Sequence, residues 1–122
     1  MAIARLPQHL TAQEREAIMA FIARLQEKFP ERIIQTIIFG SKARGDSHKW
    51  SDIDILVLVK DEDWPLRQAI NTLAARISLD YDVLIGPRVI GQQRWTRMAT
   101  RNFGLYHNIA AEGILLFSAG SG

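Results

Sequence analysis

Two short apolar runs rich in β-branched residues most constrain the fold of this chain. The first spans Ile33 to Phe39 and the second Asp52 to Val59, each about the length of a strand. Apolar residues recur at helical spacing before the first run and after the second. Strands interspersed with helices predict an α/β (α+β) protein in which helices flank a small mixed β-sheet.

Capping residues and prolines mark where the predicted helices begin and end. Thr11 and Glu14 have capping-box spacing, and Pro30 stops the helix that follows them. Acidic residues at 61–63 and Pro65 predict the start of a second helix. A third strand is predicted over 82–85, with Gly86-Pro87 ending it. Helices are then expected near 92–98 and 105–112, and a short apolar segment at 114–117.

Length and composition indicate one globular domain. The chain has 122 residues, of which 48% are hydrophobic and 23% charged, so a single domain over 1–117 with a flexible tail at 118–122 is expected. No apolar run is long enough for a membrane helix, and the absence of Cys excludes disulfides and thiolate zinc sites. A cytoplasmic protein is expected. The net charge of +2 is too small to predict direct nucleic-acid binding.

Polar residues with chemical potential stand at the ends of the predicted strands. Gly40-Ser41 follow the first strand, Asp52 and Asp54 open the second, and Asp82 opens the third. If the first two strands are antiparallel, their pieces lie at one edge of the sheet. A helical crossover over 65–79 would make the third strand parallel to the second and bring Asp82 to the same edge.

Three carboxylates at one edge predict a site for a hard cation. Asp52 and Asp54 point the same way along a strand, about 6.5–7 Å apart, and an adjacent strand lies about 5 Å away. Asp82 can therefore supply a third oxygen ligand. Carboxylates without His or Cys fit Mg²⁺ or Mn²⁺, which support in-line phosphoryl chemistry. A lone Asp-x-Asp is usually a solvated strand end, but two acids on an apolar strand are costly without ionic partners.

The residues just before this pair suit a phosphate. Gly40 permits close backbone approach, and Ser41 offers a hydroxyl and an N–H at the start of a helical turn. Lys42 and Arg44 are near enough in sequence to balance the charge of a triphosphate.

The two motifs together resemble the signature of the minimal nucleotidyltransferases, in the DNA polymerase β-like nucleotidyltransferase superfamily. Residues 40–45 read Gly-Ser-Lys-Ala-Arg-Gly and residues 51–57 read Ser-Asp-Ile-Asp-Ile-Leu-Val. The stretch 108–115 resembles the end of many members. The resemblance implies that Asp52, Asp54 and a later strand acid bind metal. Asp82 is preferred for the third role because an apolar triplet follows it directly, and Asp80 is the alternative.

The resemblance also implies an activity and a partner. Members transfer a nucleoside monophosphate, usually AMP from ATP, to a hydroxyl, with Mg²⁺ or Mn²⁺. Many minimal members are antitoxins encoded beside a HEPN-type ribonuclease toxin, and some adenylylate a Tyr of that toxin. We therefore expect an enzyme whose partners are ATP and a HEPN-type toxin. Two alternatives stay open: a small-molecule, aminoglycoside-like nucleotidyltransferase working as a homodimer, and a non-catalytic antitoxin that only binds its toxin.

Basic residues dominate the last third of the chain. After Asp82 there are four arginines and a single acid, Glu112; the arginines are Arg88, Arg94, Arg97 and Arg101. This pattern is typical of a solvated helix face, or of a surface for phosphates or an acidic partner.

Overall fold

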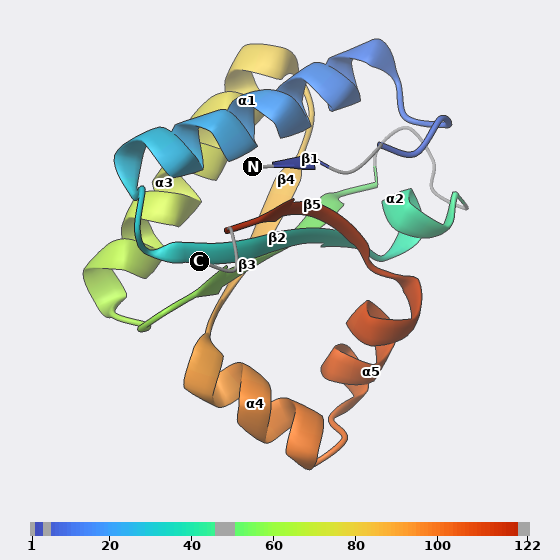
Figure 1. Ribbon diagram of the computed structural model, residues 1–122. Helices are drawn as coiled ribbons and strands as arrows, with labels where there is room; N and C mark the ends of the chain where they lie inside the picture. The colour runs from blue at the N-terminus through green and yellow to red at the C-terminus, as the bar shows by residue number, and fades with distance from the viewer. Residues whose placement is uncertain (1, 4–5, 46–50, 120–122) are drawn as a thin grey trace.

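The computed structural model describes residues 2–3, 6–45 and 51–119 and shows a sheet with helices on both faces (Figure 1). The elements in chain order are β1 (Ala2–Ile3), α1 (Ala12–Lys28), β2 (Ile33–Phe39), α2 (Ser41–Arg44), β3 (Ile53–Val59), α3 (Trp64–Tyr81), β4 (Ile85–Gly91), α4 (Gln92–Thr100), α5 (Gly104–Glu112) and β5 (Ile114–Ser118). The five strands lie in the order β1-β5-β2-β3-β4. Helices α1 and α3 cover one face, and α4 and α5 the other. The predicted mixed α/β architecture is confirmed.

Strand β3 pairs antiparallel with β2 and parallel with β4. The register places Asp54 opposite Phe39 on one side and opposite Gly86 on the other. The end of β2 and the starts of β3 and β4 therefore meet at one edge of the sheet. Both pairing directions inferred from the sequence are confirmed.

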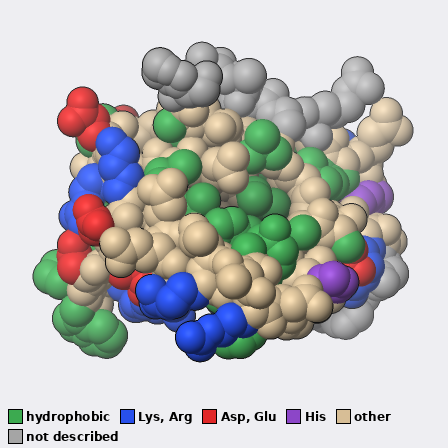
Figure 2. All heavy atoms as spheres, turned by 60° about the horizontal axis from the view of Figure 1, so that its bottom comes forward, with side chains coloured by type: hydrophobic (Ala, Val, Ile, Leu, Met, Phe, Trp, Pro, Cys, Tyr) green, Lys and Arg blue, Asp and Glu red, His purple; other side chains and the backbone are tan. Residues whose placement is uncertain are grey.

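The two faces of β3 bury different sets of side chains. Ile53, Ile55, Val57 and Val59 are fully buried in the larger core, which the apolar stripes of α1 and α3 complete. Leu56 on the opposite face belongs to a smaller core with Phe39 and Met98. Asp54 shares this second face because side chains alternate along a strand, and Asp52, just before β3, lies two residues earlier in the same alternation. Figure 2 views the molecule from its α4–α5 side, where apolar side chains gather in the middle and Lys and Arg lie along one rim.

Strand β4 differs from its predicted position. It runs from Ile85 to Gly91, so the prediction that Gly86-Pro87 end the strand is wrong. β4 is the last strand of the sheet, and proline is tolerated at an edge because its missing N–H is not needed for pairing there. Asp82 consequently lies before the strand, as the C-cap of α3.

The ends of the chain add to the sheet in a way the sequence did not predict. β1 pairs antiparallel with β5. Ser118 is the last residue of β5, and the Ala119 N–H donates to the Ile34 carbonyl at 2.8 Å. Ser118 of the expected tail therefore belongs to the sheet, Ala119 is hydrogen-bonded to β2, and 120–122 lie outside the described residues. No helix in the described segments is both long and apolar enough to cross a membrane.

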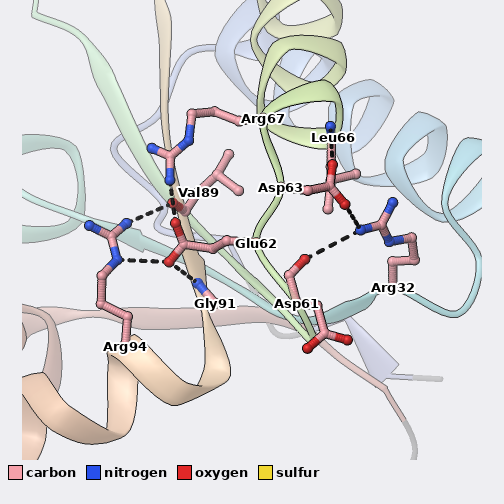
Figure 3. Close-up of polar contacts among 9 residues, drawn as sticks. All are labelled: Arg32, Asp61, Glu62, Asp63, Leu66, Arg67, Val89, Gly91 and Arg94. Carbon is pink, nitrogen blue, oxygen red and sulfur yellow. Dashed lines mark hydrogen bonds and ion pairs between the residues drawn. The ribbon is translucent and has the colours of Figure 1, made fainter.

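Glu62 organises a set of contacts over the free edge of β4 (Figure 3). Its Oε1 accepts from the Gly91 N–H at 2.8 Å and from Arg94 Nε at 2.7 Å, and its Oε2 pairs with Arg67. Arg94 also donates to the Val89 carbonyl at 3.1 Å. These contacts occupy backbone groups that an edge strand would otherwise offer to another strand.

The remaining protection of this edge comes from the other end of β4. The Ile85 N–H donates to Ser78 Oγ at 3.0 Å, and Pro87 has no N–H. These four residues, Ile85, Pro87, Val89 and Gly91, alternate along β4, which is the spacing of the backbone groups that face away from β3. The edge is therefore poorly suited to strand addition.

We predict that Glu62→Gln lowers the free energy of unfolding by about 1–3 kcal/mol at neutral pH, the scale of hydrogen bonds to a charged group. Burial raises the pKa of Glu62, but the Gly91 N–H, Arg94 and Arg67 outweigh it and hold the pKa below its ordinary value. This stabilisation is fully present at pH values above the ordinary pKa of 4.5, and it is lost as the pH falls through the lowered pKa.

Urea denaturation at several pH values measures the effect. The difference between wild type and Glu62→Gln should shrink in acid, whereas Glu27→Gln, at an exposed position on α1, should be neutral throughout. A loss independent of pH would mean that the carboxylate charge is not what stabilises this edge.

Candidate active site

Asp52 and Asp54 lie at the start of β3, on the face of the smaller core. Asp52 is exposed and Asp54 is half-buried. Burial raises the pKa of the Asp54 carboxyl above its ordinary value and the charge of Asp52 raises it further, while Arg88 and Arg44 oppose the rise. Two carboxylates held this close repel each other, which is the electrostatic condition that a bound cation relieves.

Gly40 brings the end of β2 directly against this pair. Its φ of 76° and ψ of −156° fall in a region used almost only by glycine. A Cβ built on Gly40 would lie 2.6 Å from Asp54 Oδ2. Any other residue would therefore be strained and would displace the carboxylate.

Gly86 faces the same pair from β4. A Cβ at this position would lie 3.7 Å from Asp54 Oδ1 and 3.9 Å from Asp52 Oδ2. One oxygen from each aspartate thus comes close to a single point above β4. The two carboxylates therefore face the same position and supply hard oxygen donors of the kind that Mg²⁺ or Mn²⁺ takes together with water and substrate phosphates.

Helix α2 begins at Ser41, directly after Gly40. The N–H groups of Ala43 and Arg44 donate to the Gly40 carbonyl, both at 3.1 Å, which closes the turn. The N–H groups at the start of a helix have no acceptor within it and can bind an anion. Ser41 therefore presents such an N–H directly after the glycine that lies against Asp54.

Lys42 is not placed as predicted. Its side chain is buried, with 4% exposure, and its ammonium pairs with Glu14 of α1. Glu14 also completes the capping box with Thr11, accepting from the Thr11 N–H at 2.9 Å. The expectation that Lys42 faces a triphosphate is not supported, because its charge holds α2 against the first turn of α1.

Arg44 is placed closer to the expected role. Its Nη1 donates to Glu112 Oε2 of α5 at 2.9 Å, and both side chains are partly exposed. Its positive charge also opposes the raised pKa of Asp54. Arg44 is therefore within electrostatic reach of the carboxylate pair while it ties α2 to α5.

Asp82 lies at the same edge of the sheet, in the turn before β4. It is exposed, has φ of 54°, and its N–H donates to the Ser78 carbonyl. Among the described residues no three His, Cys, Asp or Glu side chains group closely enough to hold one metal ion. The structure thus brings Asp52 and Asp54 together without adding Asp82 to the pair, and the β4 position opposite Asp54 is Gly86.

Two residues of the site were not singled out as part of it from the sequence. The sequence pattern predicts Gly86 only as the end of a strand, and Arg88 only as part of a basic segment. The signal that could have found both is the parallel register, which sets Gly86 opposite Asp54 and Arg88 opposite Leu56. The residue pattern predicts the strands but not the register between them.

Comparison with known proteins decides the family. Residues 18–90 match the nucleotidyltransferase domain family, a segment that holds the Gly40 turn, the aspartate pair and most of β4. The chain belongs to this family. The "Putative protein adenylyltransferase MJ0604" of Methanocaldococcus jannaschii is 35% identical over 104 residues, which cover 85% of this chain and 98% of that protein. The chain is therefore a nucleotidyltransferase whose curated relative is named for transfer to protein.

Solved structures of this fold include toxin–antitoxin complexes. One, a toxin–antitoxin crystal structure with AMP-PNP, is similar with a TM-score of 0.61 and 21% identity, covering 90% of this chain and 76% of that one. Another contains a tri-AMPylated Shewanella oneidensis HEPN toxin with its MNT antitoxin. It has a TM-score of 0.54 and 18% identity, covering 86% of the nucleotidyltransferase chain described here and 72% of that one. At these identities the likeness shows the nucleotidyltransferase fold.

We predict that Gly40→Ala in this nucleotidyltransferase lowers the free energy of unfolding by at least about 1–3 kcal/mol, the cost of a disfavoured backbone conformation. The close contact with Asp54 adds to this cost. Gly104→Ala is the matched control, because nothing lies within 4 Å of a Cβ there. Urea denaturation measures both, and equal effects at the two positions would contradict the assigned role of Gly40.

We predict that Asp54→Asn raises the melting temperature of the metal-free protein at neutral pH. The folded pKa of Asp54 is raised above its ordinary 3.8, so wild-type stability falls as pH rises between these two values. Asp61→Asn, an exposed acid outside the pair, should change little. Calorimetric scans with and without Mg²⁺ provide the measurement, and added Mg²⁺ should stabilise wild type more than Asp54→Asn. A lower melting temperature for metal-free Asp54→Asn would refute the repulsion.

Proposed function

We propose that this protein transfers AMP from ATP to a hydroxyl of a partner protein, in a metal-dependent reaction, and that the hydroxyl belongs to a Tyr of a HEPN-type toxin. The observation that carries the proposal is the convergence of Asp52 and Asp54 oxygens beside the Gly40 turn. This arrangement supplies cation ligands and a phosphate-binding turn at one edge of a sheet. Both are needed to activate a nucleoside triphosphate.

The nucleotide's phosphates are assigned to the β2 side of the pair. Gly40 lets the turn lie directly against Asp54, and Ser41 would donate its N–H and hydroxyl to the phosphates. Arg44 supplies positive charge and Lys42 holds the turn in place through Glu14. A Mg²⁺ held by Asp52 and Asp54 would offset the triphosphate charge and stabilise charge that develops at the α-phosphorus.

The acceptor hydroxyl must lose its proton as its oxygen bonds to the α-phosphorus, while the bond from that phosphorus to the α–β bridging oxygen breaks and pyrophosphate leaves. We assign proton acceptance to Asp82, which stands at the same edge on the β4 side and is exposed to an incoming partner. Its role as a metal ligand stays a prediction from the sequence.

A protein acceptor is supported by the comparisons. The relative from Methanocaldococcus jannaschii is named as a protein adenylyltransferase, and one similar structure holds a HEPN toxin that carries AMP. The exposed Asp52 and Asp82 also lie at an open sheet edge, where a partner can present its own hydroxyl. An antitoxin that works by this modification would inactivate its toxin covalently.

We predict that the double variant Asp52→Asn with Asp54→Asn loses AMP transfer while keeping its fold. Both cation ligands become neutral amides, so Mg²⁺-dependent ATP binding should weaken strongly. Asp82→Asn should instead cut turnover by at least about 10²-fold, the scale of general-base catalysis, with little change in Mg²⁺–ATP affinity.

The assay measures radiolabelled AMP transfer to the partner that co-purifies with the protein, beside calorimetric titration of Mg²⁺–ATP. Circular dichroism confirms folding, and Asp80→Asn is the matched control, an exposed acid two residues before Asp82. Unchanged Mg²⁺–ATP affinity in the double variant would overturn the metal site. A dead Asp80→Asn beside an active Asp82→Asn would transfer the proton-acceptor role to Asp80. Partner binding without any transfer would indicate a non-catalytic antitoxin.

A further inference from the structure

A small cleft lies over the edge strand, next to the proposed active site. It has a volume of about 160 Å³, and side chains from three helices and β4 line it. The lining includes Arg67, Asn71, Arg88, Arg94, Met98 and Leu105. We call it the β4-edge cleft.

The cleft carries an excess of positive charge. Three of its lining residues are arginines and none is acidic. Glu62, beside the cleft, pairs with both Arg67 and Arg94, so one carboxylate serves two guanidinium groups. Arg88 is exposed and adds a further positive charge. An anionic group entering the cleft would therefore be attracted, and Asn71 could donate a further hydrogen bond to it.

Arg88 connects the cleft to the aspartate pair. It lies two residues after Gly86 on β4, so the two positions share a face about 6.5–7 Å apart. Gly86 is the position above which the oxygens of Asp52 and Asp54 converge. The positive charge of Arg88 also reaches Asp54, whose raised pKa it opposes.

The sheet order assigns this cleft to the acceptor. β3 lies between β2 and β4, so the Gly40 turn and the cleft flank the aspartate pair from opposite sides. The phosphates of ATP are assigned to the β2 side. What approaches over Gly86 and Arg88 is then the group that receives AMP, and the absent side chain at Gly86 leaves its path open.

We propose that the β4-edge cleft binds an acidic side chain of the acceptor protein, located two residues from the hydroxyl that receives AMP. In an extended segment, residues two apart point the same way at the spacing that separates Gly86 from Arg88. A carboxylate on Arg88 would therefore place the neighbouring hydroxyl above the aspartate pair. This inference rests on the proposed function and adds a rule for acceptor choice.

The test uses two fluorescein-labelled peptides, Ala-Glu-Ala-Tyr-Ala and Ala-Gln-Ala-Tyr-Ala. Their binding is measured by anisotropy in the presence of Mg²⁺ and a non-hydrolysable ATP analogue. We expect wild type to bind the Glu peptide about fivefold more tightly than the Gln peptide, the scale of one partly exposed charge pair. Arg88→Gln should abolish the preference, and Arg88→Lys should retain part of it.

Arg97→Gln is the matched control, because Arg97 is exposed in the same basic segment and does not line the cleft. It should leave the preference intact. Equal binding of the two peptides by wild type, including no detectable binding of either, would overturn the proposal. So would a preference that survives Arg88→Gln. A loss of affinity for the ATP analogue in Arg88→Gln would assign the cleft to nucleotide phosphate and overturn it as well.

Radiolabelled AMP transfer from ATP to the same peptides and to the co-purified partner separates this inference from the proposed function. A Glu preference that depends on Arg88, with no AMP transfer to any acceptor, would refute the proposed function and leave the acidic-group site standing. AMP transfer to both peptides with equal KM would support the proposed function and refute the acidic-group site. With the partner as acceptor, Arg88→Gln should raise KM severalfold with a smaller change in kcat, because Arg88 positions the acceptor and does no chemistry.

Discussion

The mixed pairing of β3 is the constraint on which the rest of the structure depends. Because β3 runs antiparallel to β2 and parallel to β4, the end of one strand and the starts of two others meet at one sheet edge. A fully antiparallel arrangement would move the start of β4 to the opposite edge. The α3 crossover, packed against α1 and the sheet, therefore positions the site as well as completing the core.

The basic side chains differ in what they contact: some form ion pairs that fasten helices, and others act on the aspartate pair. Lys42 forms an ion pair with Glu14, and Glu62 forms ion pairs with Arg67 and Arg94 beside the edge strand β4. The Lys42–Glu14 pair lies beside the site, whereas the Glu62 contacts lie at the other end of β4, at Gly91. Arg44 and Arg88 act on Asp54 from its two sides, which leaves the carboxylate pair partly balanced without a cation.

Much of the fold was predictable because apolar periodicity directly reports which face of a helix or strand is buried. The stripe Leu66, Ile70, Leu73 and Ile77 is buried as expected, and the two faces of β3 join two different cores. The position of β4 was not predictable from its sequence, because a proline such as Pro87 usually marks the end of a strand and is tolerated mainly in edge strands. Whether a strand lies at an edge depends on the order of the whole sheet, which no local pattern contains.

The sequence by itself determined that Asp52 and Asp54 share a strand face and that a glycine precedes them at the end of another strand, because strand alternation is a local property of the backbone. Only the tertiary structure decided that Gly40 touches Asp54, that Gly86 stands opposite it, and that Lys42 turns away to Glu14. These contacts join residues distant in the chain. Their identity depends on strand register and helix packing, which the free energy of the whole core selects.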